Sequence, residues 1–311
     1  MNVLKRHTTM SPKPLSQLAG LSRPVRSDIT VLIPTLGRAI LEESLCCIAA
    51  GSAWPAQVMV VDQGQNPAVA AMMAQLQQIG IQTAYLSSPQ RGRARGLNRG
   101  LAQVNTPYVA ITDDDCFVQE DWLEKLAEGL RREENLVITG RVDDDGEGSM
   151  LMTVTSRQSQ VQRRPRLSFD KLSGGNMGTS MAVLRRVGFF DEDERLRTAE
   201  DGEWAYRALR AGVAIRYDPA IAVIHAGWRE EAGRLEQYRS YARSQGGFYG
   251  KYLRRGDVFI ALRIMVHLLR SLRRWMRGAL LGNPEIAALG RAYFTHLLPG
   301  VLAGLRRSST P

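Results

Sequence analysis

The sequence lacks most of the features that mark secreted, membrane-spanning or repetitive proteins. Its three cysteines, Cys46, Cys47 and Cys116, have no C-x-x-C spacing, which excludes a disulfide framework or zinc knuckle and favours a reducing cytosol. The N-terminal segment has no hydrophobic signal core, and no window of about 18 residues is uninterruptedly apolar. We therefore expect neither secretion nor a spanning helix. No self-similarity recurs at a period of about 20 to 50 residues, which excludes a repeat array.

The composition is that of a folded protein. Of 311 residues, 44% are apolar and 23% charged, enough apolar side chains to bury a sizeable core. Aromatic residues make up only 7% of the chain. This length allows one large domain with additions, or two small domains.

The formal net charge of +10 is concentrated at the two ends of the chain. Residues 1–27 hold five basic and no acidic residues, 28–228 hold 21 basic and 26 acidic, and 229–311 hold 15 basic and 5 acidic. Charge alone would favour a nucleic-acid-binding protein, but that function needs basic and aromatic residues across a folded face. The acidic middle suits a cation or a metal-bridged anion instead, and we expect no nucleic-acid partner.

Short apolar runs alternate with amphipathic stretches from Asp28 onward, as in ITVLIPT, QVMVVD, IQTAYL, YVAITD and LVITGR. This rhythm predicts an α/β fold with a mostly parallel, Rossmann-like sheet covered by helices on both faces. We expect a flexible basic tail over 1–27, a catalytic domain over 28–228 with a loop-rich insertion at 142–175, and a basic helical appendage over 229–311.

Polar residues close the predicted strands, and in open parallel sheets ligands bind beyond the carboxyl ends of the strands. These residues are Pro34, Thr35, Asp62, Asp113, Asp114, Asp115 and His225. Taken alone, the aspartate run is a solvated turn or a helix cap. Alternate carboxylates can nevertheless face one ligand, and oxygen ligands suit Mg²⁺ or Mn²⁺ shared with a nucleoside diphosphate.

Four further motifs have a structural and a functional interpretation. The run RGRARGLNRG could be an exposed turn that opens a helix, and Thr198-x-x-Asp201 matches a capping box. His225 could be an ordinary core or edge histidine. Asn176, in GGNMG, could belong to a tight turn.

Several motifs in the same order resemble the family 2 glycosyltransferases of the GT-A fold. They are ITVLIPTLGR, VMVVDQG, RGRARGLNRGL, YVAITDDDC, GGNMG, FFDED and AEDGEWAYRALRAG, over roughly residues 28–228. The resemblance implies that Pro34, Thr35 and Asp62 line the nucleoside pocket, with Asp62 accepting from the base. It implies that Asp113 contacts the ribose and Asp115 the metal, with Asp114 beside them.

The later motifs carry the remaining roles that the resemblance implies. Arg93 or Arg95 supplies a charge in the segment that also holds Asn98, where many members have an arginine just before the asparagine. Asp201 matches the catalytic base, with Glu200 as its partner. His225 completes the metal site with Asp115, and Asn176 shapes the acceptor pocket.

The predicted reaction is inverting transfer of a sugar from a nucleotide-diphosphate sugar to an acceptor hydroxyl, in glycan or polysaccharide precursor assembly. Asp201 takes the proton, and Mg²⁺ or Mn²⁺ stabilises the departing nucleoside diphosphate. The enzymatic alternative is a sugar nucleotidyltransferase, which usually has a Gly-rich, Lys-bearing signature where this chain has PTLGRAI. An oxidoreductase is disfavoured because no G-x-G-x-x-G follows the first strand. The absence of Q-x-x-R-W disfavours a processive synthase.

The C-terminal segment VFIALRIMVHLLRSLRRWMRG mixes apolar residues with arginines. It predicts either a helix packed on the catalytic domain with its arginines in water, or an interfacial helix on anionic lipid. The second alternative predicts an enzyme held on the cytoplasmic face of the membrane, near a lipid-linked acceptor.

Overall fold

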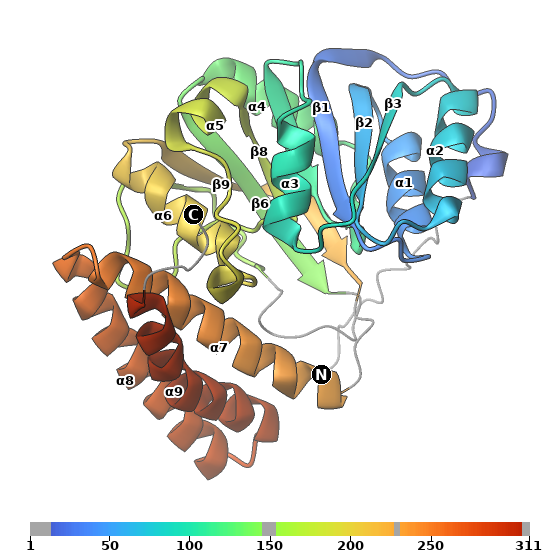
Figure 1. The fold of residues 1–311 in the computed structure, drawn as a ribbon. Coiled ribbons are helices and arrows are strands. Elements are labelled where there is room, and N and C mark those ends of the chain that lie inside the picture. Colours follow the sequence, from blue (N-terminus) through green and yellow to red (C-terminus); the bar gives the residue numbers. More distant parts are fainter. Residues whose placement is uncertain (1–13, 145–153, 227–230, 307–311) are drawn as a thin grey trace.

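The protein is described by a computed structural model that covers residues 14–144, 154–226 and 231–306. A nine-stranded sheet forms its centre (Figure 1). The strands are β1 Val25–Thr35, β2 Trp54–Asp62, β3 Thr83–Ser87, β4 Tyr108–Thr112, β5 Cys116–Val118, β6 Leu136–Asp144, β7 Gln160–Gln162, β8 Asn176–Ser180 and β9 Ala214–His225. Their order is β3-β2-β1-β4-β8-β6-β9-β5, with β7 paired to β9.

The sheet is parallel in its first half and mixed in its second. Strands β3, β2, β1 and β4 run parallel, as the alternation of strands and helices predicts. Strand β8 then pairs antiparallel with both β4 and β6, and β5 and β7 pair antiparallel with β9. The GGNMG motif forms a turn and then a strand: the Asn176 N–H donates to the Ser173 carbonyl at 3.1 Å across Gly174 and Gly175, and β8 begins at Asn176. Its segment is buried throughout.

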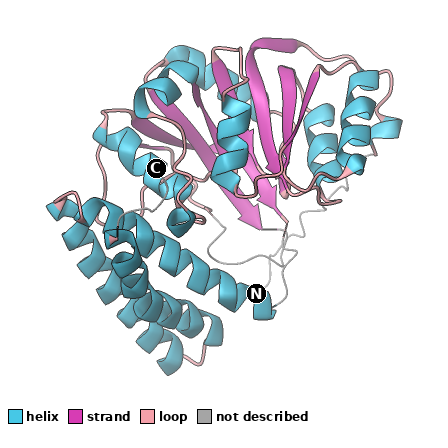
Figure 2. Cartoon of the chain, in the orientation of Figure 1, coloured by secondary structure: helices cyan, strands magenta, loops and turns pink. Residues whose placement is uncertain are grey.

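Helices cover both faces of the sheet, which confirms the predicted α/β class (Figure 2). One face packs against α1 Leu41–Ala50, α2 Pro67–Ile79 and α4 Trp122–Arg132. The other packs against α3 Arg93–Leu101, α5 Met181–Val187 and α6 Glu200–Arg210. Because both faces are covered, β4 and the second halves of β1 and β2 are mostly apolar and buried.

Three long helices form a separate layer at the C-terminus, where a helical appendage was predicted: α7 Glu231–Leu253, α8 Val258–Leu280 and α9 Pro284–Leu305. Figure 1 shows α7 passing below the sheet, with α8 and α9 farther from it. Glycines let α7 and α9 approach closely. A Cβ on Gly246 would lie 2.2 Å from the Leu297 carbonyl oxygen, and one on Gly300 would lie 2.1 Å from that of Arg243.

The structure differs from the sequence-based prediction near the N-terminus and in the insertion. In the predicted flexible tail, Leu15 and Leu18 are buried in the core beside α1 and α2, and Leu15 opens a short 3₁₀ helix, η1 Leu15–Gln17. Residues 1–13 of that tail, and most of the turn predicted at DDDGEG, lie outside the described residues. The remaining part of the insertion contains β7 and the loop that leads to β8.

One helix of the described chain, α9, is long and apolar enough to cross a membrane by length and composition. In its most apolar stretch 39% is buried inside the molecule, against α7 and α8. A packed core helix meets the same criteria, so this feature does not by itself place α9 in a bilayer.

Candidate active site

A cleft of about 1110 Å³ lies between the carboxyl ends of the central strands and the C-terminal helices. It is lined by ten residues that the sequence singled out: Pro34, Thr35, Arg93, Arg95, Asp113, Asp114, Asp115, Glu200, Asp201 and His225. They come from β1, α3, α6, β9 and the turn after β4. The fold therefore brings together most of the predicted site.

Two carboxylates of the aspartate run, those of Asp114 and Asp115, contact Arg38, and Asp114 also contacts Thr35. Thr35 donates to Asp114 Oδ2 at 2.6 Å, and the guanidinium of Arg38 binds both Asp114 oxygens and reaches Asp115 Oδ2 at 3.0 Å. Asp114 is 1% exposed. Its burial raises the pKa of the carboxyl, and the hydrogen bonds from Arg38 and Thr35 oppose that shift. Asp114 thus anchors the turn, while Asp115 remains directed at the cleft.

Asp115 and His225 lie side by side where β5 begins and β9 ends. His225 Nε2 is 3.7 Å from Asp115 Oδ1, and the backbones of Cys116 and His225 pair across the two strands. The ligand atoms of Asp115, Cys116 and His225 all lie within 4.8 Å of one another. His225 Nδ1 is buried and has no hydrogen-bond partner among the described residues. This donor set fits a divalent cation, with the carboxylate oxygen and imidazole nitrogen as its ligands.

Arg93 connects the aspartate run to the start of α6. Its Nε donates to Asp113 Oδ1 at 2.8 Å and its Nη1 to Glu200 Oε1 at 3.1 Å. Burial disfavours the charge on Arg93, but Asp113, Glu200 and Asp201 outweigh it and raise its pKa. The preceding Gly92 has φ 124°, a conformation that favours glycine and starts α3 at Arg93. Both arginines that the sequence offered for this charge line the cleft, and Arg93 contacts Asp113 and Glu200 whereas Arg95 binds Glu194.

Asp201 and Glu200 form the first turn of α6 and are held inside the cleft. Gly174 N–H donates to Asp201 Oδ2 at 3.2 Å, and Gly202 N–H donates to Oδ1 at 2.7 Å. Burial raises the pKa of Asp201 against the opposing charge of Arg93. Burial also raises the pKa of Glu200 to about 7, and the Arg93 charge limits that shift. Both carboxyls are thus better proton acceptors than ordinary surface acids.

The capping-box alternative for this segment is wrong. Ala199 occupies the N-cap of α6 and offers no side-chain cap, and the buried Thr198 hydroxyl has no hydrogen-bond partner among the described residues. Asp201 accepts instead from Gly174, on the loop before β8. A Cβ at Gly174 would lie 2.9 Å from Arg93 Nη1 and 3.0 Å from Asp201 Oδ2, so a larger residue here would displace these two side chains.

Two residues predicted to bind the nucleotide sugar lie away from the cleft lining. Asp62 is 0% exposed, and its carboxylate accepts from Gly64 N–H, Asn66 N–H and the Tyr85 hydroxyl, so it orders the loop after β2. Its neighbour Gln63 lines the cleft instead. The Asn98 side chain binds the loop after α5: its amide forms hydrogen bonds with the backbone of Phe190 and with the Glu192 side chain. Neither side chain has the predicted ligand-facing position.

Asn176, predicted to shape the acceptor pocket, also lies outside the described cleft lining. Asn176 is fully buried, and Trp122 Nε1 donates to its Oδ1 at 2.8 Å. Its Nδ2 donates to the carbonyls of Arg141 and Ile221. With these bonds its side chain ties β8 to α4, β6 and β9, because a buried amide must be satisfied inside the protein.

Sequence reasoning missed two residues of the site. Arg38 belongs to the PTLGR motif, and its position just after the first strand was the available signal. Cys116 was considered only as a possible disulfide or zinc ligand. Its place directly after the aspartate run was a signal for the strand pairing that sets it beside His225.

The chain is similar to known glycosyltransferases in sequence and in fold. Residues 30–190 match the profile of Glycosyl transferase family 2. The pre-mycofactocin glycosyltransferase of Mycobacterium tuberculosis (strain CDC 1551 / Oshkosh) is 25% identical over 212 residues, covering 66% of this chain and 44% of that protein. The hyaluronan synthase of Pasteurella multocida is 23% identical over 260 residues, covering 71% and 26%. The chain thus spans less than half the length of both relatives.

The fold is similar to that of the mannosyltransferase PcManGT from Pyrobaculum calidifontis, solved in complex with GDP-Man and Mn²⁺. The TM-score is 0.60 at 18% identity, and the match covers 92% of this chain and 87% of that one. The likeness therefore extends through the catalytic fold into the helical layer.

Proposed function

The chain is a member of glycosyl transferase family 2 with the GT-A fold, and we propose on this basis that it transfers a sugar from a nucleoside diphosphate sugar to an acceptor hydroxyl, with inversion. The observation that carries the proposal is the meeting of Asp201 with the aspartate run in one cleft. Asp201 lies beyond the residues that match the family profile, and Arg93 joins its neighbour Glu200 to Asp113. A panel of nucleotide sugars tests the function.

Asp201 is the general base of this reaction. The acceptor oxygen forms a bond to the anomeric carbon, its proton passes to the Asp201 carboxylate, and the bond from that carbon to the diphosphate oxygen breaks with its electron pair. Attack opposite the leaving group inverts the anomeric centre. The Gly174 and Gly202 amides hold the carboxylate in place, and its raised pKa suits proton uptake.

Asp115 and His225 would hold Mg²⁺ or Mn²⁺, which would neutralise charge on the leaving diphosphate. The buried, unpartnered Nδ1 of His225 and the nearby Asp115 carboxylate fit such an ion. Thr35 and Pro34, which line the cleft, would flank the nucleoside, and Asp113, which is partly exposed, would contact the ribose. The relative solved with GDP-Man and Mn²⁺ supports this donor class and metal.

No described contact favours the two other candidate functions. A sugar nucleotidyltransferase would place a basic glycine-rich loop on the substrate phosphates after the first strand. Here the loop's Arg38 is paired with Asp114 and Asp115. A nucleic-acid-binding protein would leave basic residues along a groove available to phosphates, whereas in this cleft Arg38, Arg93 and Arg263 are paired with carboxylates.

The outer face of α8 supports the proposal that the enzyme binds a membrane surface. The inner face packs through Ile260, Ile264 and His267. Side chains opposite them are apolar yet exposed, at helical spacing: Val258, Leu262, Met265, Leu269, Met276 and Leu280. Val258 is 73% and Leu280 82% exposed. A helix packed with its arginines in water does not account for this second apolar face.

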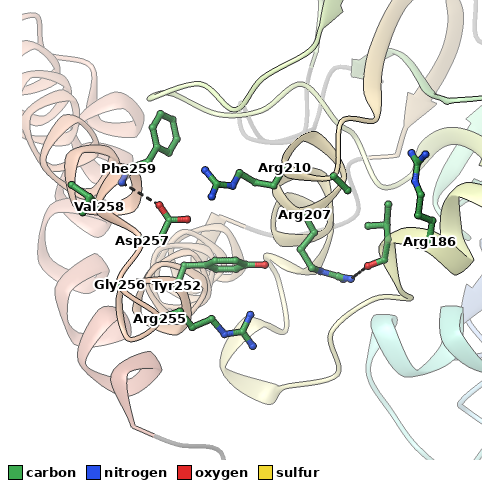
Figure 3. A pocket seen from close by; sticks show the side chains of 11 residues that line it. Arg186, Arg207, Arg210, Tyr252, Arg255, Gly256, Asp257, Val258 and Phe259 are labelled. Atoms are coloured by element: carbon green, nitrogen blue, oxygen red, sulfur yellow. Dashed lines mark hydrogen bonds between the residues drawn. The ribbon is translucent and has the colours of Figure 1, made fainter.

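Arginines border the apolar face of α8. Arg270, Arg273 and Arg277 are exposed on the same helix. At the start of α8, Figure 3 shows a hollow into which Arg210 of α6 and Arg255 point, beside Val258 and Phe259. An apolar face bordered by cationic groups fits the interface of an anionic bilayer. Arg263, expected among these cations, is instead buried in an ion pair with Asp170.

We expect the protein to sediment with vesicles that contain phosphatidylglycerol and to be released by high salt, since each basic residue near the surface contributes about 1 kcal/mol. Leu262→Ser with Leu269→Ser should weaken this binding because both side chains are exposed on the face. Val161→Ser with Leu167→Ser removes exposed apolar side chains elsewhere and should change nothing. Failure to sediment even at low ionic strength would contradict membrane association.

A further inference from the structure

The cleft extends beyond the donor half of the site to a second wall made by the C-terminal helices. Residues of α7, α8 and α9 line it together with the catalytic residues: Tyr241, Gln245, Tyr249, Arg274, Leu289 and Tyr293. Tyr293 of α9 and Asp201 line the same cleft. A molecule seated on this wall would therefore adjoin the proposed base.

An exposed aromatic ring projects into the cleft from the loop before β8. Phe169 is 47% exposed, although its ring lies 4.6 Å from that of His267 and 6.4 Å from that of Tyr293, centroid to centroid. The loop is fixed rather than loose, because Arg263 donates to the Ser168 carbonyl at 2.8 Å and to Asp170 at 2.6 Å. A rigid, half-exposed ring in a concave site offers a flat apolar surface to a sugar ring.

The charged side chains that the C-terminal helices contribute to this wall are basic. The helices contribute no acidic side chain to the described cleft lining, and Asp170 is neutralised by Arg263. Arg274 lines the cleft, is exposed, and has no hydrogen bond or ion pair among the described residues. Burial first, and then the charges of Arg263, Arg270 and Arg274, lower the pKa of His267 to about 3, so this neighbour adds no charge.

We propose that the α7–α9 wall is the acceptor subsite, and that it takes a saccharide bearing an anionic group, phosphate or carboxylate, with a sugar ring on Phe169 and the anion at Arg274. This assignment rests on the proposed glycosyl transfer and adds the class of acceptor. The helical layer then has a part in the reaction: it places the acceptor hydroxyl beside Asp201.

The test uses the full-length protein with metal removed by EDTA, so that no cation captures a phosphate. Saturation-transfer NMR would measure the dissociation constants of glucose, glucuronic acid and glucose 1-phosphate. At least one charged probe should bind about fivefold more tightly than glucose, which is what one exposed ion pair can give. The tighter of the two identifies the anion.

Variants separate this subsite from the donor site. Arg274→Gln should reduce the charged probes to the affinity of glucose, whereas Arg291→Gln, which removes an exposed arginine from α9 outside the cleft, should not. Phe169→Ala should weaken all three probes alike, and Asp115→Ala should leave them unchanged. Equal binding of charged and neutral probes, or a charge preference that survives in Arg274→Gln, would overturn the proposal even if metal-dependent nucleotide binding is observed.

Discussion

Asp201→Asn is expected to lower turnover by roughly 10² or more while leaving the affinity for the nucleotide sugar nearly unchanged. Asparagine keeps the size of the side chain and can still accept from the Gly174 amide, which donates to Asp201 at 3.2 Å. It cannot take up the acceptor proton. The loss should therefore fall on kcat, and steady-state kinetics with calorimetric donor binding would measure both quantities.

Glu192→Gln is the matched control for this variant. It also removes one negative charge near the start of α6, but Glu192 lies outside the cleft lining and binds Asn98. Its turnover should match that of the wild type. If Asp201→Asn also retains near-normal turnover, Asp201 only orders the loop at Gly174 and is not the base.

Asp115→Ala is expected to abolish the part of nucleoside diphosphate affinity that depends on Mn²⁺. Asp115 is the carboxylate beside His225, whereas Asp114 is held by Thr35 and Arg38 and stays buried. Removing Asp115 leaves the imidazole as a poor single ligand for a hard cation. Titration calorimetry with and without Mn²⁺ would measure the loss.

Glu120→Ala serves as its control, since Glu120 is an exposed carboxylate just beyond the end of β5. This variant should bind nucleotide as the wild type does. Equal metal-dependent affinity in Asp115→Ala and the wild type would place the cation elsewhere.

The elements of the fold could be predicted because their signals are local. Apolar runs such as that of β4 and the amphipathic period of α6 are set by neighbouring residues, and strand-end aspartates mark the ligand edge of a parallel sheet. The antiparallel β8 could not be predicted in the same way. Its pairing with β4 and β6 depends on partners that are distant in the sequence.

The candidate functional residues also depend on contacts between residues that are distant in the sequence. Asp115, Asp201 and Arg93 reach the cleft, whereas Asp62 and Asn176 have the expected residue type and spacing but bind protein groups. The partners of Asn176 are Trp122, Arg141 and Ile221, and no short motif contains that information. Residue identity predicts which side chains can bind a ligand, and tertiary packing decides which remain available to do so.

Which face of α8 is exposed could also not be predicted from the sequence. Its sequence contains enough apolar residues to form two faces, and only the packing against α9 decides which of them is buried. Arg263 is one of the arginines of the segment that could face lipid, yet it is 2% exposed and fixes the loop that carries Phe169.

Thermal unfolding of the wild-type protein with a panel of nucleoside diphosphates and their sugars, with and without Mn²⁺, tests the central claim most directly. A ligand of the native state at about 100 times its dissociation constant adds about 2.7 kcal/mol of stability. We predict that at least one nucleoside diphosphate and its sugar raise the unfolding midpoint, and that Mn²⁺ enlarges the rise. No rise with any member of the panel, in the presence of Mn²⁺, would contradict a metal-assisted nucleotide-sugar transferase.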